Sequence, residues 1–334
     1  MNTRKGTASP ATSVTDSRSS WAQICAGLGA ASWAAIAVLA RAGIARIGAI
    51  ELMFLFAPLV IVPIGMELGL RFGGREQRVG AAARKLQPLG AALAIVSVCL
   101  PPGTSAAALA SGWMLVCALA ALSGVMDMIP AWRPDARSDA TPSFSLLRFT
   151  LALARIDLAV GGAWLVASRL GMRPMGIQEP IGLLTAVHFH FAGFATATIA
   201  AATLHFAESR GSDRWLHWVV TAVVVMPYVI AIGFVTTSAI KMAAGVAFSI
   251  SVAALAVLLR SYGGRSASQP ARVLLQIAAV SVFAGMMLAA VFAIADFRGS
   301  DLLPIPQMAR THGILNAVGF CMCGLLGWVI EVTP

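Results

Sequence analysis

Long apolar stretches separated by short polar segments run through almost the whole chain. Each stretch is continuously hydrophobic and rich in Ala, Leu and Gly. A helix needs roughly 20 mostly apolar residues to cross a bilayer, whereas a membrane β-barrel would show short alternating segments. The stretches are 22–43, 50–70, 87–101, 105–126, 149–169, 182–204, 215–236, 238–259, 273–295 and 311–331. The pattern predicts an all-α, polytopic bundle of about ten transmembrane helices.

Two boundaries leave nine spans as an alternative. The third stretch is short and is ended by Pro101 and Pro102. The seventh and eighth stretches nearly touch across Thr236, Thr237 and Ser238. We expect ten spans, and nine remains the alternative.

The first 20 residues are polar and predict a disordered N-terminal tail, so that residues 21–334 form a single transmembrane helical domain. The first apolar stretch is longer than the core of a typical signal peptide, and no convincing small-residue cleavage site follows it. We therefore expect this stretch to be retained as the first span.

The composition excludes the soluble classes. The chain is 58% hydrophobic and 11% charged, whereas soluble domains carry about 25% charged residues. So few charges cannot cover the outside of a soluble enzyme or a nucleic-acid-binding protein of this length. The expected partner is the lipid bilayer, with no nucleic acid.

The net charge of +10 is explained by topology. With the N-terminus in the cytoplasm, sixteen of the 24 Lys and Arg residues fall on the inner side, seven on the outer side, and Arg155 within a span. Loops on the cytoplasmic side of membrane proteins are enriched in Lys and Arg. The count therefore predicts ten spans with both termini in the cytoplasm.

Polar residues inside or beside the spans are the candidates for chemistry, because ionisable groups are costly in a membrane and mark functional sites. They comprise Glu51, Asp157, Trp164, Glu179, Thr185, His188, His190, His312 and Asn316. In the predicted topology, most of them lie in the outer half of the bundle, and Asp157 lies nearer the middle.

Helix geometry sorts these residues. Thr185 and His188 are three apart and share a face, whereas His190 lies about 200° further round the axis than His188. His188 and His190 therefore cannot both point into one site on a regular helix. On the last span, His312 and Asn316 are four apart and form one polar stripe.

Several segments resemble the YndJ-like family of bacterial integral membrane proteins. The resemblance is carried by the segments Ala57–Pro63, Val160–Leu165, Leu184–Phe194, His312–Gly313 and Asn316–Phe320, and it extends over roughly residues 50–330. It implies a shared fold, a shared polar site and a multi-pass location in the bacterial cytoplasmic membrane, without defining a reaction.

Each candidate also has a structural interpretation. Either histidine of the pair His188 and His190 serves packing between helices. His312 starts a helix that Thr311 caps, and Asn316 bonds to a neighbouring helix. Asp157 forms an ion pair with Arg155 or Arg148. Glu179 is a solvated loop carboxylate, and Trp164 is an interfacial anchor.

The favoured functional hypothesis is a membrane-embedded enzyme that uses acid–base chemistry on a lipophilic small molecule. Histidine, with an ordinary pKa of about 6.5, gives and takes protons, and a carboxylic acid in apolar surroundings donates them. Such groups catalyse isomerisation, dehydration, epoxide opening or cyclisation without a cofactor. The predicted catalytic residues are His188, His190, His312, Asp157 and Glu51, and the predicted substrate-binding residues are Thr185, Asn316, Trp164 and Glu179.

Two other functions remain open. A small-molecule or proton-coupled transporter would use the same residues as a proton relay, and Arg155 and Asp157 extend the polar groups toward the depth that such a path needs. A haem or metal protein would use the histidines as ligands. The spacing of His188 and His190 places them on different helix faces, so no metal site is expected.

Overall fold

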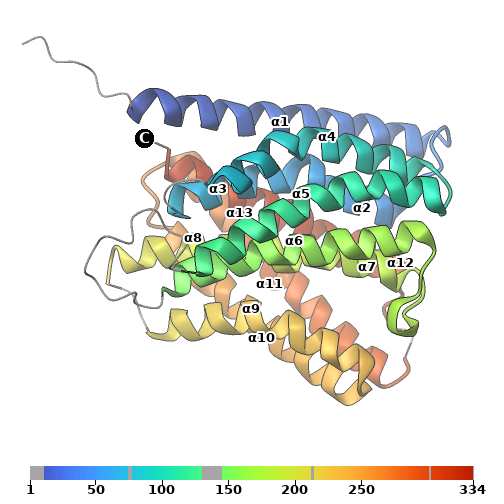
Figure 1. Cartoon of the computed structure of the whole chain (residues 1–334). Coiled ribbons are helices and arrows are strands. Elements are labelled where there is room, and N and C mark those ends of the chain that lie inside the picture. The colour runs from blue at the N-terminus through green and yellow to red at the C-terminus, as the bar shows by residue number, and fades with distance from the viewer. Residues whose placement is uncertain (1–10, 74–76, 130–144, 212–213, 301, 334) are drawn as a thin grey trace, which may run out of the picture.

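The computed structural model describes residues 11–73, 77–129, 145–211, 214–300 and 302–333, with side chains from Trp21 onward. These residues form an all-α bundle whose helices run back and forth along one axis (Figure 1). The helices are α1 (Ala11–Arg41), α2 (Ala49–Phe56), α3 (Val62–Gly73), α4 (Arg78–Cys99), α5 (Thr104–Met128), α6 (Leu146–Leu170), α7 (Ile181–His188), α8 (Thr196–Glu208), α9 (Arg214–Val235), α10 (Ser238–Gly263), α11 (Gln269–Phe297), α12 (Ile305–Met308) and α13 (Cys323–Glu331).

Three of the long helices contain π-helical segments, which join their shorter pieces. The segment η1 (Ala57–Ile61) joins α2 to α3, and η4 (Phe189–Ala195) joins α7 to α8. The segments η5 (Ala309–Gly313) and η6 (Leu315–Met322) lie between α12 and α13. The described residues therefore contain ten long helices.

Nine of these long helices are long and apolar enough to cross a membrane. The exception is α4, whose first turns carry Arg78, Arg84 and Lys85 and whose interior contains Pro88. Its 22 residues nonetheless extend about 33 Å at 1.5 Å per residue, enough to cross the hydrocarbon core. The start of α1 and the end of α13 lie at the same end of the bundle (Figure 1), which requires an even number of crossings. The chain is a multi-pass membrane protein, and its geometry agrees with ten spans.

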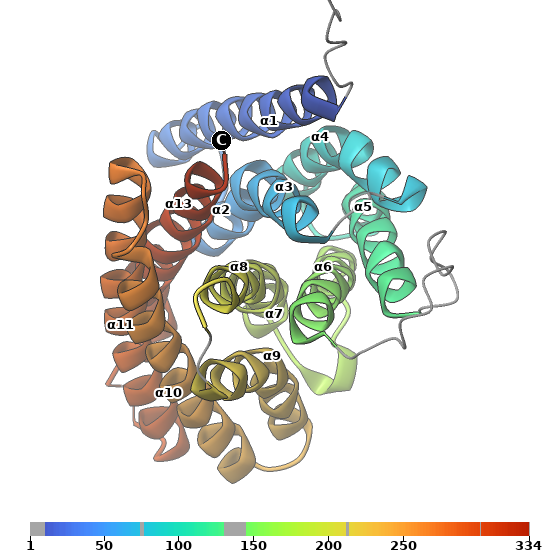
Figure 2. The same cartoon turned by 90° about the vertical axis from the view of Figure 1, so that its left-hand side faces the viewer.

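The helices with π-helical segments form the centre of the bundle (Figure 2). In the most apolar part of Ile181–Glu208, 78% of the residues are buried, against 11% for Trp21–Arg41 of α1 at the edge. The segments η1, η4 and η6 contact one another. The central helices thus depart from regular α-geometry where they meet.

A π-turn shifts the backbone hydrogen bonds and changes which carbonyls are available to side chains. Gln87 of α4 donates its amide to the Pro58 carbonyl in η1, at 2.6 Å. The hydroxyl of Thr196 donates to the Phe191 carbonyl in η4, at 2.9 Å. These side chains supply hydrogen bonds where water is absent, as burial in a membrane requires.

Several helix boundaries differ from the prediction. Helix α1 begins at Ala11, within the segment predicted to be disordered, because a helix that has formed extends at little cost into residues that contain no strong breaker; residues 1–10 of that tail lie outside the described part. Helix α4 begins at Arg78, ahead of the predicted 87–101. The predicted start of the last span at Thr311 is wrong, because the helix begins at Ile305.

This topology predicts which loops an impermeant thiol reagent reaches. In a variant without the five native cysteines, Met175→Cys in the exposed loop after α6 should be labelled in intact cells by a maleimide that cannot cross the membrane. Ser209→Cys, in the loop after α8, should be labelled only after the membrane is opened. Labelling of Ser209→Cys in intact cells would contradict the assigned orientation.

Candidate functional site

His188 and His312 form the centre of the candidate site. His188 ends α7 and His312 lies in η5, yet the two side chains are close enough to interact electrostatically. The His188 side chain is exposed and that of His312 is partly exposed. The tertiary structure therefore brings together two histidines that are more than 120 residues apart in the sequence.

Both histidines are held in the same way by a backbone carbonyl. The Nδ1 of His188 lies 2.7 Å from the Leu184 carbonyl, and the Nδ1 of His312 lies 2.9 Å from the Gly285 carbonyl. Because a carbonyl oxygen only accepts, each Nδ1 carries the hydrogen, and Nε2 carries the lone pair of the neutral ring. Neither Nε2 has a hydrogen-bond partner among the described residues. The site thus presents two imidazole nitrogens that can accept a proton.

Asn316 supports His312 from the next turn. Its amide nitrogen donates to the His312 carbonyl at 2.7 Å and lies 3.2 Å from Nδ1. A side chain at Gly285 would place its Cβ only 2.6 Å from this amide nitrogen, so the glycine allows α11 to approach. The structure therefore confirms the shared stripe of His312 and Asn316, whereas the hydroxyl of Thr311 donates to the Gln307 carbonyl within the helix and does not cap it.

His190 points to a different part of the bundle. It is fully buried, and its Nε2 accepts a hydrogen bond from the indole of Trp113, at 3.0 Å. Its Nδ1 donates to the Ala186 carbonyl, at 2.8 Å. The ring of Phe54 packs edge-on against it. Both ring nitrogens are hydrogen-bonded, so the geometry favours a packing role. His190 has no free nitrogen with which to act as a catalyst.

Asp157 is buried and accepts a hydrogen bond from the Tyr228 hydroxyl at 2.6 Å. The expected ion pair with Arg155 or Arg148 is wrong within the described residues. Arg155 points away, to Asp127 at 2.8 Å, because residues two apart on a helix face different directions. Gly193 of η4 leaves room for the Asp157 carboxyl, which a Cβ there would approach to 2.8 Å.

Glu51 and Glu179, at the starts of α2 and α7, lie near a buried cation. Both interact electrostatically with Arg169, which is 5% exposed and donates to the Leu100 carbonyl at 2.5 Å. Glu179 also accepts the backbone N–H of Leu183, at 3.1 Å, in the first turn of α7. This arrangement favours charge compensation over contact with a ligand for both carboxylates. Arg169 itself, counted above as an outer-side charge, lies inside the protein.

Among the described residues, no hydrogen bond joins Thr185 or Trp164 to His188 or His312. The Thr185 hydroxyl donates to the Ile181 carbonyl, at 2.8 Å, within its own helix. Trp164 is partly buried and packs against the hydrophobic core. Their predicted roles in substrate binding remain predictions. Among the described residues, no three or more His, Cys, Asp or Glu side chains are grouped as a metal ion would require.

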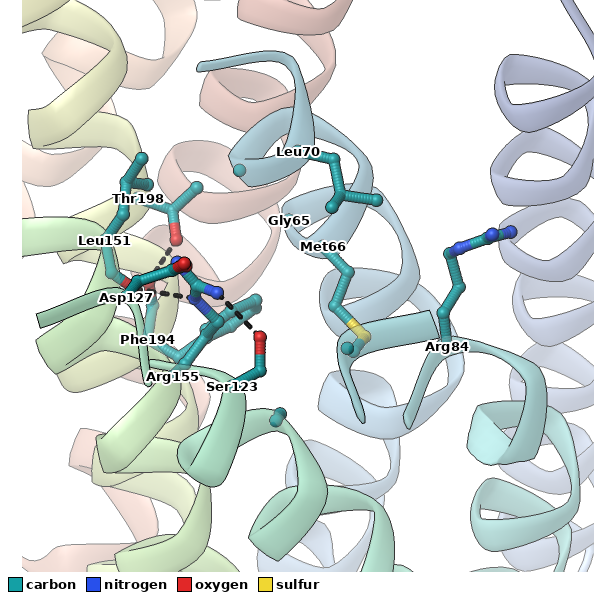
Figure 3. A pocket seen from close by; sticks show the side chains of 13 residues that line it. Gly65, Met66, Leu70, Arg84, Ser123, Asp127, Leu151, Arg155, Phe194 and Thr198 are labelled. Atoms are coloured by element: carbon teal, nitrogen blue, oxygen red, sulfur yellow. Dashed lines mark hydrogen bonds and ion pairs between the residues drawn. The ribbon is translucent and has the colours of Figure 1, made fainter. Parts of the chain in front are cut away.

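A pocket lies in the half of the bundle that contains the chain termini, between α3, α4, α5, α6 and the start of α8. Its cavity volume is about 50 Å³. Figure 3 shows the Arg155 guanidinium between Asp127 and Ser123, with Met66 lying between this group and Arg84. The pocket contains none of the residues predicted for the site.

Sequence reasoning missed three polar partners. Trp113 and Tyr228 were not identified because a single aromatic residue in an apolar stretch carries no periodic signal. Asp127 falls just beyond the predicted span 105–126, so it was treated as part of a loop. The rarity of tyrosine, with only two in the chain, was the one signal that pointed to Tyr228.

The contacts of His190 predict a loss of stability on its removal. His190→Ala deletes two buried hydrogen bonds and leaves a cavity among α5, α6 and η4, which should cost about 2–4 kcal/mol. Unfolding in detergent micelles measures the change. His217→Ala is the matched control, because that side chain is 42% exposed beside Glu208 and surface pairs contribute little. Equal stability of the two variants would contradict the packing role.

Comparisons with known proteins agree with the membrane fold. The family model described as "YndJ-like protein" matches residues 52–320. The chain is 29% identical over 182 residues to the "Uncharacterized membrane protein YndJ" of Bacillus subtilis (strain 168), a match that covers 53% of this chain and 32% of that protein. The matched part thus spans about a third of the relative's length. No solved structure matches. Because the family match covers most of the chain, this protein belongs to the YndJ-like family of membrane proteins.

Proposed function

We propose that this protein is a membrane-embedded acid–base catalyst that acts on a lipophilic small molecule at His188 and His312. The observation that carries the proposal is the pair of Nε2 atoms that have no hydrogen-bond partner among the described residues. In each ring Nδ1 is bonded to a backbone carbonyl, at 2.7 Å for His188 and 2.9 Å for His312. Fixed ring orientations of this kind prepare a general base for its substrate.

Two neighbouring imidazoles suit reactions that move a proton within one substrate. One neutral histidine takes a proton from the substrate at Nε2, and the imidazolium so formed returns that proton to another substrate atom, either directly or by way of its partner's Nε2, so that both rings end neutral. The sum is an isomerisation, a cyclisation or an epoxide opening when no atom is lost, or a dehydration when a protonated hydroxyl leaves as water. Neither histidine needs a cofactor for these steps.

Asp157 and Tyr228 supply a second acidic group near this site. Phe189 follows His188 directly and packs edge-on against the Tyr228 ring, with 6.2 Å between ring centroids. Tyr228 in turn donates to Asp157. The pair of Asp157 and Tyr228 therefore connects α6 and α9 to the residue that follows α7. We assign this pair two roles: it positions His188, and it holds a proton that can be exchanged near the site.

The apolar surroundings define the class of substrate. Ile314, between His312 and Asn316, is 52% exposed, and Leu184 and Phe189 flank the His188 turn. A ligand at the two Nε2 atoms would contact aliphatic and aromatic side chains, which favour a lipophilic molecule with one or two polar groups.

Transport is the second candidate. The observation in its favour is that polar groups occur at several depths: Arg169 at the outer end, Asp157 and Tyr228 further in, and Arg155 with Asp127 beside the inner pocket. A proton-coupled path needs such groups along its whole length. A transporter would move the same lipophilic molecule without altering it.

The proposal predicts that His188→Ala and His312→Ala each abolish conversion while the protein stays folded. Membranes containing each variant would be incubated with a hydrophobic extract of the producing cells, and products followed by mass spectrometry for changes that conserve mass or remove water. His217→Ala, at the other end of the bundle, should keep full activity. Full activity in both His188→Ala and His312→Ala would place the reaction elsewhere.

The same variants separate the two candidates. Conversion by the purified protein in open detergent micelles would exclude pure transport. Uptake of an unaltered compound into sealed vesicles, lost in His188→Ala and without conversion in micelles, would exclude the enzyme.

A further inference from the structure

One face of α7 is left uncovered by the other helices. Its accessible side chains recur every three or four residues, at Ile181, Leu184, Thr185 and His188, and the residues between them are buried. The first three are partly exposed and His188 is exposed. This spacing places all four on one side of the helix, and we call these four residues the uncovered face of α7.

The packing around the central helix explains this exposure. Helix α7 packs against α2, α6 and η4, and the described residues give it no comparable packing against α9, α10 or α11. Its continuation α8 does pack against α9, α10 and α13. In Figure 1, α9 and α10 incline away from α6 and α7 toward the end of the bundle where α7 begins. The central helix is thus enclosed in its inner half and uncovered on one side in its outer half.

The polar groups of the uncovered face are bonded within their own helix. The Thr185 hydroxyl donates to the Ile181 carbonyl at 2.8 Å, and the His188 Nδ1 donates to the Leu184 carbonyl at 2.7 Å. No hydrogen bond joins this face to another helix in the part of the chain that the structure describes. Polar side chains at contacts between membrane helices usually bond across them, so this face is built to meet something other than a helix.

The depth of the two histidines places the site in the hydrocarbon region. His188 follows Ile181 by seven residues and His312 follows Ile305 by seven, and at those two residues their helices begin at the outer end. Both histidines therefore lie roughly 10 Å along the helix axis from the outer end. One leaflet of the hydrocarbon core is about 15 Å thick. The Nε2 atoms thus lie among lipid chains, below the headgroups.

The chemistry of the face selects its occupant. It carries no Lys, Arg, Asp or Glu, and Ile181 and Leu184 are aliphatic along its outer turns. Ile314, beside His312, is 52% exposed. A charged headgroup would be left without partners here, and an unpaired charge in apolar surroundings is costly. An uncharged hydrocarbon chain matches the outer turns, and a small polar group in that chain matches the histidines below.

We infer that the substrate is a chain lipid that enters from the outer leaflet along the uncovered face of α7, with its reacting group inside the chain. A double bond, an epoxide or a hydroxyl at the depth of His188 and His312 is such a group. The assignment of the reacting group rests on the proposed function. The access of lipid chains to α7 does not, and it is measured without knowledge of the reaction.

Spin labels on the whole chain, reconstituted in phospholipid vesicles without the five native cysteines, test this access. A label at Leu184→Cys should collide often with oxygen, which concentrates in lipid, and seldom with a water-soluble nickel chelate. It should resemble Leu28→Cys on α1, and differ from Met175→Cys in the outer loop; both reference positions are exposed. Leu183→Cys, on the buried side of α7, is the matched control and should collide with neither reagent.

A second position measures depth. The ratio of oxygen to nickel collisions should be higher at Leu184→Cys than at Ile181→Cys, because the face runs from the headgroups into the hydrocarbon. Nickel collisions at Leu184→Cys as frequent as those at Met175→Cys would show that water lines the face. Collisions as rare as those at Leu183→Cys would show that protein covers it. Either result, or a ratio that does not rise, would overturn the inference.

A filling variant tests the route itself. Leu184→Trp places a bulky ring on the uncovered face and should slow the conversion that depends on His188 about tenfold, whereas Leu28→Trp should keep the full rate. Unfolding curves identify variants that are not folded. Undiminished conversion in folded Leu184→Trp would overturn the route. Frequent oxygen collisions at Leu184→Cys together with no conversion by the unaltered chain would overturn the proposed function alone.

Discussion

The absence of water inside a bilayer is the constraint on which the rest of this structure depends. Every buried polar group must find its partner within the protein. In the three central helices, π-helical segments contact one another, and side-chain donors such as Gln87 and Thr196 bond to carbonyls within those segments. The centre of the bundle is thus held by packing together with specific hydrogen bonds from neighbouring helices.

The same constraint places three histidines in different hydrogen-bond environments. His190 has a donor and an acceptor at its two nitrogens, Trp113 and the Ala186 carbonyl, and it is fully buried. His188 and His312 each have one nitrogen bonded to a carbonyl, and their side chains are accessible. A satisfied imidazole stabilises a fold, whereas a half-satisfied one that a ligand can reach is available for chemistry. This difference separates the candidate site from the packing around it.

Buried charges follow the same rule at other depths. Arg155 forms an ion pair with Asp127, Arg169 interacts electrostatically with Glu51 and Glu179, and each arginine also donates to a backbone carbonyl. Asp157 has a neutral tyrosine as its partner. Residues two apart in the sequence thus have separate partners, because the helical rotation turns Arg155 toward α5 and Asp157 toward α9. Sequence proximity is a poor guide to pairing within a membrane helix.

The sequence by itself determined the fold class, the number of long helices, the stripe of His312 and Asn316, and the separation of His188 from His190. All of these follow from local composition and from the period of a helix. Only the tertiary structure decided that His188 lies within electrostatic range of His312, that Tyr228 rather than Arg155 bonds Asp157, and that Arg169 is buried against the Leu100 carbonyl. Those pairings depend on how distant helices rotate and pack, and on glycines such as Gly193 and Gly285 that let them approach, so the apolar pattern of a single helix does not contain them.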